Sequence, residues 1–265
     1  MLNNFSVLII GCKKHEQIAK RSFDLIDIFW KDIKGSITFC TDSIDEYQNN
    51  FSGGKIVEET SGSYCERIKK GLEKINSDYV LLLLDDYFLT REVKNNNFER
   101  ILEQIKLSNT MYCKLIGLPI CFKKFKSVKG AHQIKKFTHY GVSLQPSIWK
   151  KDALLEALSY CTGSSAWEVE TGFQKYQHEN FAQCITFNVN YLKIKNASLR
   201  GQITPGVDRL LRNNNIEPLD MKKVCCIKYK LFMLKQHIAM HLPRFIRKIG
   251  KKFGSLFGKK YYSES

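Results

Sequence analysis

The most constraining feature of the sequence is an unbroken apolar run that ends in two adjacent acids. Residues 78–90 read DYVLLLLDDYFLT, so four leucines lead directly into Asp85 and Asp86. A continuous apolar run, as opposed to an alternating one, is typical of a strand that is buried on both faces of a parallel sheet. The run therefore predicts a central strand with two carboxylates at its carboxyl end.

Further apolar strands alternate with helical patterns around this run. We expect strands over 6–11, 36–40, 55–59, 79–84, 114–120, 140–149 and 187–194. We expect helices over 15–31, from Ser63, from residue 98, over 152–158 and from Ser164, with a basic loop over 122–139. This order predicts an α/β fold with a doubly wound, mostly parallel sheet flanked by helices.

The charge of the chain is concentrated near its C-terminus. The 265 residues carry a formal net charge of +16. Residues 221–265 hold 12 Lys and Arg residues against one acid, Glu264, and their apolar residues recur every three or four positions. This pattern predicts one or two amphipathic basic helices, kinked or split at Pro243. We therefore expect a catalytic domain over 1–205, a linker over 206–220 and a basic helical tail over 221–265.

Cysteine usage and hydropathy bear on the compartment. The nine cysteines include no C-x-x-C pair, which favours a reducing environment with buried thiols. The N-terminal apolar run resembles a first strand more than a signal peptide, and no run reaches the roughly 18–20 apolar residues of a membrane span. We expect a cytoplasmic protein that lies peripherally on the inner face of the cell membrane.

Two adjacent carboxylates at a strand end repel each other, and a nearby core deprives both of water. A divalent cation such as Mg²⁺ or Mn²⁺ would remove this conflict, and such cations often bridge carboxylates to substrate phosphates. The alternative is that Asp85 caps a turn and Asp86 is solvated. In open α/β sheets, ligands bind at the carboxyl ends of the strands, which is where this pair lies, and residue types alone leave both interpretations open.

Four segments together resemble GT-A-fold glycosyltransferases, in particular the small bacterial enzymes of capsule and lipopolysaccharide synthesis. The segments are SDYVLLLLDDYFLT, YGVSLQPSIWKKDALLEAL, SSAWEVE and SLRGQ, within residues 5–205. The resemblance implies transfer of a sugar from a nucleotide donor to a saccharide acceptor, which in envelope assembly is often lipid-linked. This chain departs from a strict Asp-x-Asp motif, since Leu84 and Tyr87 flank the pair.

The resemblance also implies roles for individual residues. Asp86 would be the main ligand of a Mn²⁺ or Mg²⁺ ion, with Asp85 nearer the ribose, and Arg67 would lie near the diphosphate. The remaining donor-binding residues would be Gly11, Cys12, Lys13, Thr41 and Asp42 around the nucleoside, and Arg200 and Gln202 in a late loop over the diphosphate.

The general base and the acceptor contacts would come from two segments. An inverting transfer needs a carboxylate that accepts the proton of the attacking hydroxyl. The resemblance favours Glu168, although Ser165-x-x-Glu168 also fits a helix capping box, and Glu170 is a rival. Gln145, Trp149 and Trp167 are the predicted acceptor contacts, with the two indoles as sugar-stacking platforms or as core residues.

The tail is open to three interpretations. An amphipathic basic helix suits an anionic bilayer surface, and we favour this partner for residues 221–265. The same apolar face could instead pack on the catalytic domain or on a second subunit in a homo-oligomer. Nucleic acid is disfavoured, because no recognisable binding module accompanies the charge. Two alternatives to a glycosyltransferase stay open: a nucleotidyltransferase on a similar sheet, and a non-catalytic binding protein that acts through its tail.

Overall fold

The computed structural model describes residues 4–44, Tyr47, Phe51, 54–242, Ile246 and Ile249. The strands are β1 (Phe5–Ile10), β2 (Ile37–Thr41), β3 (Lys55–Glu58), β4 (Tyr79–Leu84), β5 (Tyr87–Leu89), β6 (Tyr112–Lys114), β7 (Ala131–Gln133), β8 (Ser147–Lys150), β9 (Cys184–Phe187), β10 (Ile194–Asn196), β11 (Ser198–Leu199) and β12 (Gln202–Ile203). The α-helices are α1 (Glu16–Phe29), α2 (Tyr64–Glu73), α3 (Asn95–Leu107), α4 (Lys151–Ser159), α5 (Ala166–Asn180), α6 (Val207–Asn213) and α7 (Cys226–His241). Short 3₁₀ turns lie at Lys13–His15, Lys31–Ser36 and Phe181–Gln183.

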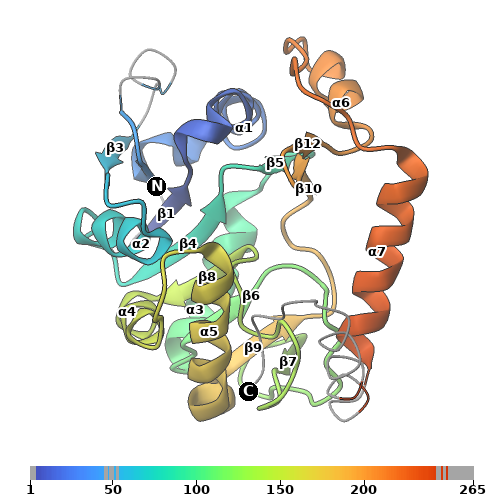
Figure 1. The fold of residues 1–265 in the computed structure, drawn as a ribbon. Coiled ribbons are helices and arrows are strands. Elements are labelled where there is room, and N and C mark those ends of the chain that lie inside the picture. Colours follow the sequence, from blue (N-terminus) through green and yellow to red (C-terminus); the bar gives the residue numbers. More distant parts are fainter. Residues whose placement is uncertain are drawn as a thin grey trace.

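Eight strands form one mixed sheet in the order β3-β2-β1-β4-β8-β6-β9-β7 (Figure 1). The first four of these strands are parallel to one another, and β8 then pairs antiparallel with β4. In the register of β1 and β4, Ile10 lies opposite Leu84. The residues that follow these two strands therefore meet at one edge of the sheet, which is the edge where open α/β sheets bind ligands.

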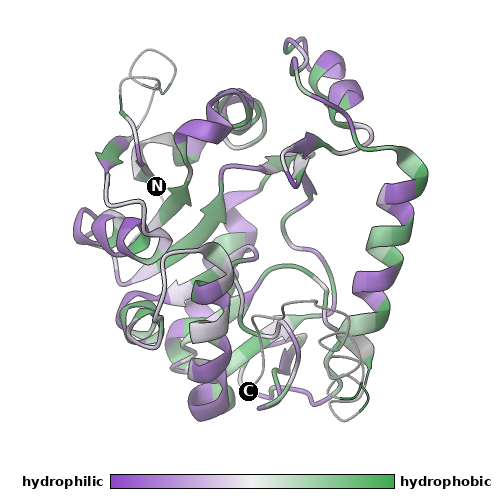
Figure 2. Ribbon diagram, viewed as in Figure 1, coloured by the Kyte–Doolittle hydropathy of each residue, from purple (hydrophilic) through white to green (hydrophobic). Residues whose placement is uncertain are grey.

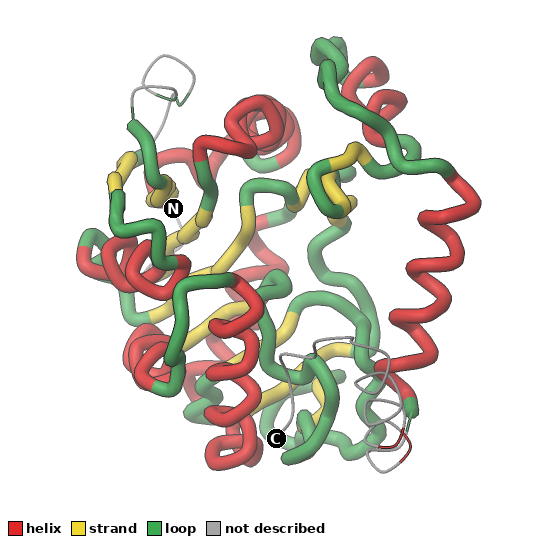
Figure 3. The backbone as a smooth tube through the Cα atoms, in the orientation of Figure 1, coloured by secondary structure: helices red, strands yellow, loops and turns green. Residues whose placement is uncertain are grey.

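Alternate residues of the central strands pack into two separate cores. Val7 and Leu81 belong to the core under α1 and α3, whereas Leu8 and Leu82 belong to the core under α2, α4 and α5. Figure 3 shows the strands in the middle of the molecule with helices on either side. Because both faces of β1 and β4 are covered, these strands need apolar residues at every position, which explains the unbroken leucine run.

Two helices begin at the serines that the sequence marks as caps. Ser63 accepts a hydrogen bond from the backbone N–H of Glu66 at the start of α2. At the start of α5, Ser165 and Glu168 form a complete capping box, in which each side chain accepts from the other residue's backbone N–H. These contacts satisfy backbone donors that a helix start leaves unpaired, and they fix where both helices begin.

Three predicted strands are wrong in extent. Within 114–120 and 140–149, only the residues shared with β6 and β8 are strand, and 187–194 joins the end of β9 to the start of β10. The apolar residues that suggested strands are nonetheless buried; Val142 and Leu192, for example, are both inaccessible to solvent. They fill the core from irregular segments, so burial without regular pairing produced the same sequence pattern.

The segment 206–220, predicted to be a linker, is instead part of the folded body. Helix α6 and the residues after it contribute to a third core with α1, β5 and β12. The members of this core are Ile18, Leu25, Phe88, Ala197, Ile203, Val207, Leu211, Ile216 and Leu219. Apolar burial of this kind stabilises the segment against the sheet's flank, so the folded body extends beyond residue 205 to Leu219.

Helix α7 confirms a helix within the basic tail. It lies at one side of the molecule, after a backbone link in which Val224 N–H donates to Ile203 O at 2.9 Å. Figure 2 shows apolar and polar residues interspersed along its length, and Ile227, Leu231, Leu234 and Ile238 are exposed. None of the described helices is long and apolar enough to cross a bilayer. The predicted break at Pro243 lies outside the described residues.

Candidate active site

The acid pair lies where β1 and β4 end. The backbone N–H of Asp85 donates to Ile10 O at 3.0 Å, which continues the pairing of the two strands by one residue. The Asp85 carboxylate then accepts from the backbone N–H of Cys12 at 3.3 Å. Asp85 is only 4% exposed, so its position is fixed by the most buried part of the sheet.

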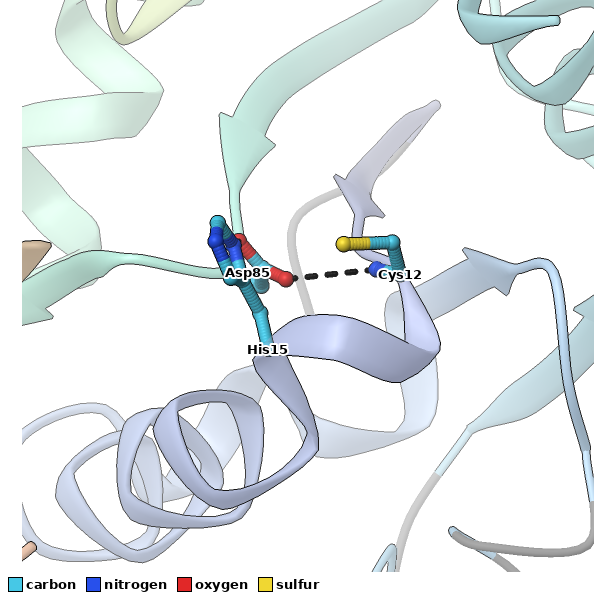
Figure 4. A group of neighbouring side chains, drawn as sticks. All are labelled: Cys12, His15 and Asp85. Atoms are coloured by element: carbon cyan, nitrogen blue, oxygen red, sulfur yellow. Dashed lines mark hydrogen bonds and ion pairs between the residues drawn. The ribbon is translucent and has the colours of Figure 1, made fainter. Parts of the chain in front are cut away.

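Asp85 faces Cys12 and His15, as Figure 4 shows. His15 Nδ1 lies 3.4 Å from Asp85 Oδ1, and one ligand atom from each of the three side chains lies within 4.8 Å of the other two. The hydrogen bond to Asp85 raises the pKa of His15 to about 10. Burial raises the pKa of Asp85, and His15 opposes that shift. The sequence analysis missed His15, because Lys13-Lys14-His15 reads as a solvated basic turn.

Asp86 faces a different environment. Its carboxylate accepts from the Ser198 hydroxyl at 3.2 Å, and its backbone carbonyl accepts from Ala197 N–H at 2.7 Å. The second carboxylate oxygen, Oδ1, is buried and has no hydrogen-bond partner among the described residues. Burial, with a smaller contribution from Asp85, raises the pKa of Asp86 to about 7. An unsatisfied buried carboxylate oxygen fits a cation ligand, so Asp86 suits the predicted Mg²⁺ or Mn²⁺ role.

Asp85 fits that metal role less well. Its two oxygens are directed at Cys12 and His15, so the carboxylates of Asp85 and Asp86 do not converge on one point in this structure. A hard cation at Asp86 would therefore have one protein carboxylate, with its other positions available to substrate oxygens. The structure thus separates the two acids that the sequence analysis treated as a joint metal site.

The predicted late loop reaches the acid pair. β10 pairs antiparallel with β5, which follows Asp86 directly, and β11 and β12 form a hairpin beside it. Arg200 and Gly201 make the tight turn of this hairpin with φ values of 54° and 74°. Positive φ at both central residues is typical of a type I′ turn, and it fits glycine best. Arg200 is exposed at the tip and Gln202 is half-buried, and contact of either residue with a donor stays a prediction.

The predicted nucleoside-binding residues come together at the same edge. Lys13 N–H donates to the Asp42 carboxylate at 2.5 Å, which joins the turn after β1 to the end of β2, next to the buried Thr41. A Cβ on Gly11 would lie 2.6 Å from the Phe39 ring and 3.0 Å from Asp85, so a larger residue would push the turn away. Tyr47, which the sequence analysis missed, donates to Cys12 O at 2.9 Å.

Arg67 holds this turn through its guanidinium. Its guanidinium donates to Gly11 O at 2.7 Å and lies 5.2 Å from the centre of the Tyr64 ring. The side chain is 7% exposed, and its charge lowers the pKa of Asp85 against the effect of burial. Arg67 therefore holds the first turn and adds positive charge at the edge of the sheet, while contact with a diphosphate stays a prediction.

Glu168 and Glu170 have different surroundings. The Glu168 carboxylate accepts from the Ser165 N–H at 2.9 Å and the Ser165 hydroxyl at 2.7 Å, and these bonds lower its pKa. Glu168 is thus committed to the capping box. Glu170 is half-buried and accepts one long bond of 3.4 Å from Leu144 N–H. Burial raises the pKa of Glu170 to about 7, which suits a base at neutral pH. Of the two predicted bases, Glu170 has the surroundings that fit the role better, while the role itself stays a prediction.

The charge of Glu170 acts on a buried lysine, Lys114. Lys114 is fully buried on β6, and its ammonium donates to Tyr140 O, to Gly141 O at 3.4 Å and to Ser143 Oγ at 3.3 Å. Burial lowers the pKa of Lys114 to about 7, and the Glu170 charge opposes that shift. Sequence reasoning missed Lys114, because a lysine within a strand normally marks an exposed position.

Tyr87 links Glu170 to the acid pair. Burial is the main reason why the pKa of Tyr87 is raised, and the charges of Asp86 and Glu170 raise it further, so both carboxylates act on the same hydroxyl. The half-buried Gln145 follows Leu144, the residue that bonds Glu170, and its carbonyl oxygen is buried without a partner among the described residues. An unsatisfied acceptor beside a candidate base suits a substrate hydroxyl, as predicted for Gln145.

The two tryptophans differ in exposure. Trp149 is inaccessible to solvent, and its ring packs on Tyr112, Phe173 and Tyr176 in the core. It offers no face to a sugar, contrary to the stacking role predicted for it, because a strand in mid-sheet is covered by α5. Trp167 is 59% exposed in the first turn of α5 and stays available for that role.

The fold defined by these elements is the Rossmann-like GT-A type, a mixed sheet flanked by helices. Among solved structures, the chain is similar to S. aureus TarS, with a TM-score of 0.50 and 14% identity over 89% of this chain and 43% of that one. It is also similar to the mannosyltransferase PcManGT from Pyrobaculum calidifontis in complex with GDP-Man and Mn²⁺, with a TM-score of 0.45 and 12% identity over 74% of this chain and 58% of that one.

A cytidylyltransferase from Leptospira borgpetersenii is similar as well, with a TM-score of 0.45 and 11% identity over 73% of this chain and 81% of that one. No family model and no curated protein sequence matches the chain. The chain spans less than half of the length of TarS. At these identities the likeness concerns the fold, so the reaction must be argued from the side chains.

Proposed function

We propose that the chain is a nucleotide-sugar glycosyltransferase that binds its donor at the carboxyl edge of β1, β2 and β4. Two half-buried carboxylates carry the proposal: Asp86 at the end of β4, with a buried oxygen that has no partner among the described residues, and Glu170 on α5, which accepts one long bond from Leu144 N–H. One carboxylate has an unsatisfied oxygen suited to a cation and a diphosphate, and the other has the pKa of a general base.

The proposed reaction is a single displacement. The acceptor hydroxyl oxygen attacks the anomeric carbon of the donor, and the bond from that carbon to the diphosphate oxygen breaks. Glu170 takes the hydroxyl proton, and the nucleoside diphosphate leaves with the bonding electrons. A cation held by Asp86 would neutralise charge that develops on the diphosphate. Attack opposite the leaving group inverts the anomeric configuration.

Several neighbouring groups position these participants. Lys114 fixes the 140–143 backbone from within the core, and through Leu144 it sets where the Glu170 carboxylate lies. The β11–β12 hairpin places Ser198 on Asp86 and completes that side of the site. The acceptor would bind between Gln145 and Trp167. It would be a saccharide of the cell envelope, of either capsular or lipopolysaccharide type.

The test is to incubate the purified chain and Mn²⁺ with a panel of nucleotide sugars. A donor present at about 100 times its Kd should first be found as a stabilisation of about 2.7 kcal/mol. Turnover should then release nucleoside diphosphate. Release of pyrophosphate would indicate a nucleotidyltransferase instead, and stabilisation by no nucleotide sugar would contradict the donor site.

We further propose that α7 docks on an anionic membrane surface. Ile227, Leu231, Leu234 and Ile238 are exposed and lie at steps of four, three and four residues, which puts them on one side of the helix. The same spacing is used by coiled coils, so a second copy of α7 is the alternative occupant.

The residues beside this stripe decide between the two occupants. Lys228 and Lys235 border it on one side, and Lys230 and His237 border it on the other. In a coiled coil of two copies, these bordering positions face each other, and all of them are basic. Anionic phosphates satisfy the same lysines while the stripe enters the headgroup boundary. Flotation with anionic vesicles, but not with zwitterionic ones, is the expected result.

A further inference from the structure

A cluster of three different ligand types lies at the end of β1 and β4. It comprises the Cys12 thiol, the His15 ring and the Asp85 carboxylate, with one ligand atom of each within 4.8 Å of the other two (Figure 4). We propose that this cluster binds one thiophilic divalent cation of the Zn²⁺ class. This inference stands independently of the proposed glycosyl transfer.

The donor set determines the class of ion. One sulfur, one nitrogen and one oxygen are the ligands of Zn²⁺, which binds sulfur at about 2.3 Å and nitrogen or oxygen at about 2.0–2.2 Å in tetrahedral sites. Those lengths put neighbouring ligand atoms about 3.3–3.8 Å apart. His15 Nδ1 and Asp85 Oδ1 already lie 3.4 Å apart. If the Cys12 thiol moved closer to these two atoms, the three ligand atoms would occupy three corners of a tetrahedron around the ion.

Rigid neighbours hold the cluster in place. Asp85 is anchored by its own backbone bond to Ile10 and by the Cys12 N–H. The Cys12 carbonyl accepts from the fully buried Tyr47. Gly11 permits the close approach, because a Cβ at that position would lie 3.0 Å from Asp85 Oδ2. Fixed supporting contacts of this kind are what a metal site needs, since they limit the rearrangement that binding requires.

The cluster is also reachable from solvent. Cys12 and His15 are half-buried, whereas Asp85 behind them is buried. Three protein ligands with an open fourth position are typical of zinc sites that accept water or another small ligand. Asp86 offers only oxygen to its surroundings and suits a hard cation, so the two adjacent aspartates would select different metals.

Co²⁺ is the probe for this site, because it replaces Zn²⁺ and has colour. Metal-free, reduced full-length protein is titrated with Co²⁺ in the absence of nucleotide. The expected result is a one-to-one complex with visible bands of tetrahedral Co²⁺ and a near-ultraviolet thiolate-to-cobalt band. Zn²⁺ should abolish both, and Mg²⁺ in excess should not. Absence of the thiolate band would overturn the proposal.

Variants assign the ligands. Cys12→Ser should lose the thiolate band, and His15→Gln should weaken Co²⁺ binding by more than the roughly 10- to 100-fold that loss of a ligand's hydrogen-bond partner costs. The matched control is Cys225→Ser/Cys226→Ser, which removes the two exposed thiols at the start of α7. A thiolate band that survives in Cys12→Ser, or one that is lost in the control, would refute the site.

Thermal unfolding without metal tests whether the variants fold. Cys12→Ser exchanges one half-buried atom and should leave the midpoint unchanged, whereas Zn²⁺ should raise the midpoint of the wild type only. Equal stabilisation of wild type and Cys12→Ser by Zn²⁺ would also contradict the proposal. Because no donor is present in these experiments, a failed glycosyl transfer assay would not affect their outcome.

Discussion

Replacing Glu170 by Gln tests the assignment of the general base. The substitution keeps the size of the side chain and removes its ability to take a proton. General bases contribute about 10²- to 10⁴-fold to rate, which corresponds to about 2.7–5.5 kcal/mol of transition-state stabilisation. We therefore expect kcat to fall by at least about 100-fold. The assay is initial-rate release of nucleoside diphosphate at saturating donor and acceptor.

The pH profile gives the same test without a substitution. With a pKa of about 7, Glu170 is charged in about one tenth of molecules at pH 6 and about nine tenths at pH 8. Activity should therefore rise about tenfold between these pH values, whereas a base with the ordinary pKa of 4.5 would give a flat profile. A flat profile in the wild type would refute the environment described for Glu170.

Glu168→Gln is the matched control. Glutamine also serves in a capping box, so α5 should begin at the same residue and turnover should change little. The pH dependence of the stability of Glu170→Gln is an independent test of the raised pKa. Burial raises the folded-state pKa of Glu170, so its contribution to stability is present below about pH 4.5 and is lost as the pH rises through about 7. Glu170→Gln should gain stability relative to wild type at pH 8 and not at pH 4. Loss of activity in Glu168→Gln, with activity kept in Glu170→Gln, would show that Glu168 and not Glu170 is the base.

Three other substitutions extend the test to the rest of the molecule. Asp86→Asn keeps the bond from Ser198 and removes the charge, so activity should fall by at least about 100-fold with the thermal midpoint preserved; full activity would exclude a cation role. Lys114→Met removes a positive charge that lowers the pKa of Glu170, so the rising limb of the pH–rate profile should move to higher pH, and an unmoved limb in a folded variant would contradict that coupling. Leu231→Asp places a charge in the exposed stripe of α7 and should abolish flotation with anionic vesicles while leaving donor binding intact; unchanged flotation would favour another surface.

The sequence predicted the centre of the fold better than its flank. β4 matches the predicted strand residue by residue, because Asp78 and Asp85 bound a run that has no polar position. The predicted strand at 140–149 shrank to a few residues, although Val142 and Leu144 are buried as expected. Hydropathy reports burial, and only regular pairing with a neighbour makes a buried segment a strand. The partners of this segment are distant in sequence, so its local pattern could not show the difference.

The sequence predicted which edge of the sheet carries the site, but it did not predict the surroundings of each side chain there. The carboxyl ends of parallel strands lie at the same edge of a sheet. The turn after β1, the end of β2 and the acid pair therefore lie together, as expected. The choice between Glu168 and Glu170 was not decidable from residue types, because a capping box and a general base both use an acid in the first turns of a helix. Burial is the basis on which we propose Glu170, and its surroundings depend on the 140–144 segment, which contacts Glu170 on α5 through Leu144.

The geometry at the strand end accounts for the conflict posed by adjacent acids. Successive residues of an extended chain point to opposite sides, so Asp85 turns toward the β1 turn and Asp86 toward the β11–β12 hairpin. Their carboxylates therefore have separate partners, although the Asp85 charge still raises the pKa of Asp86. An intervening residue would have put both acids on the same side of the strand. The LDDY sequence instead gives each acid its own environment, one with sulfur and nitrogen nearby and one with oxygen alone, and we propose different metals for the two sites because of that separation.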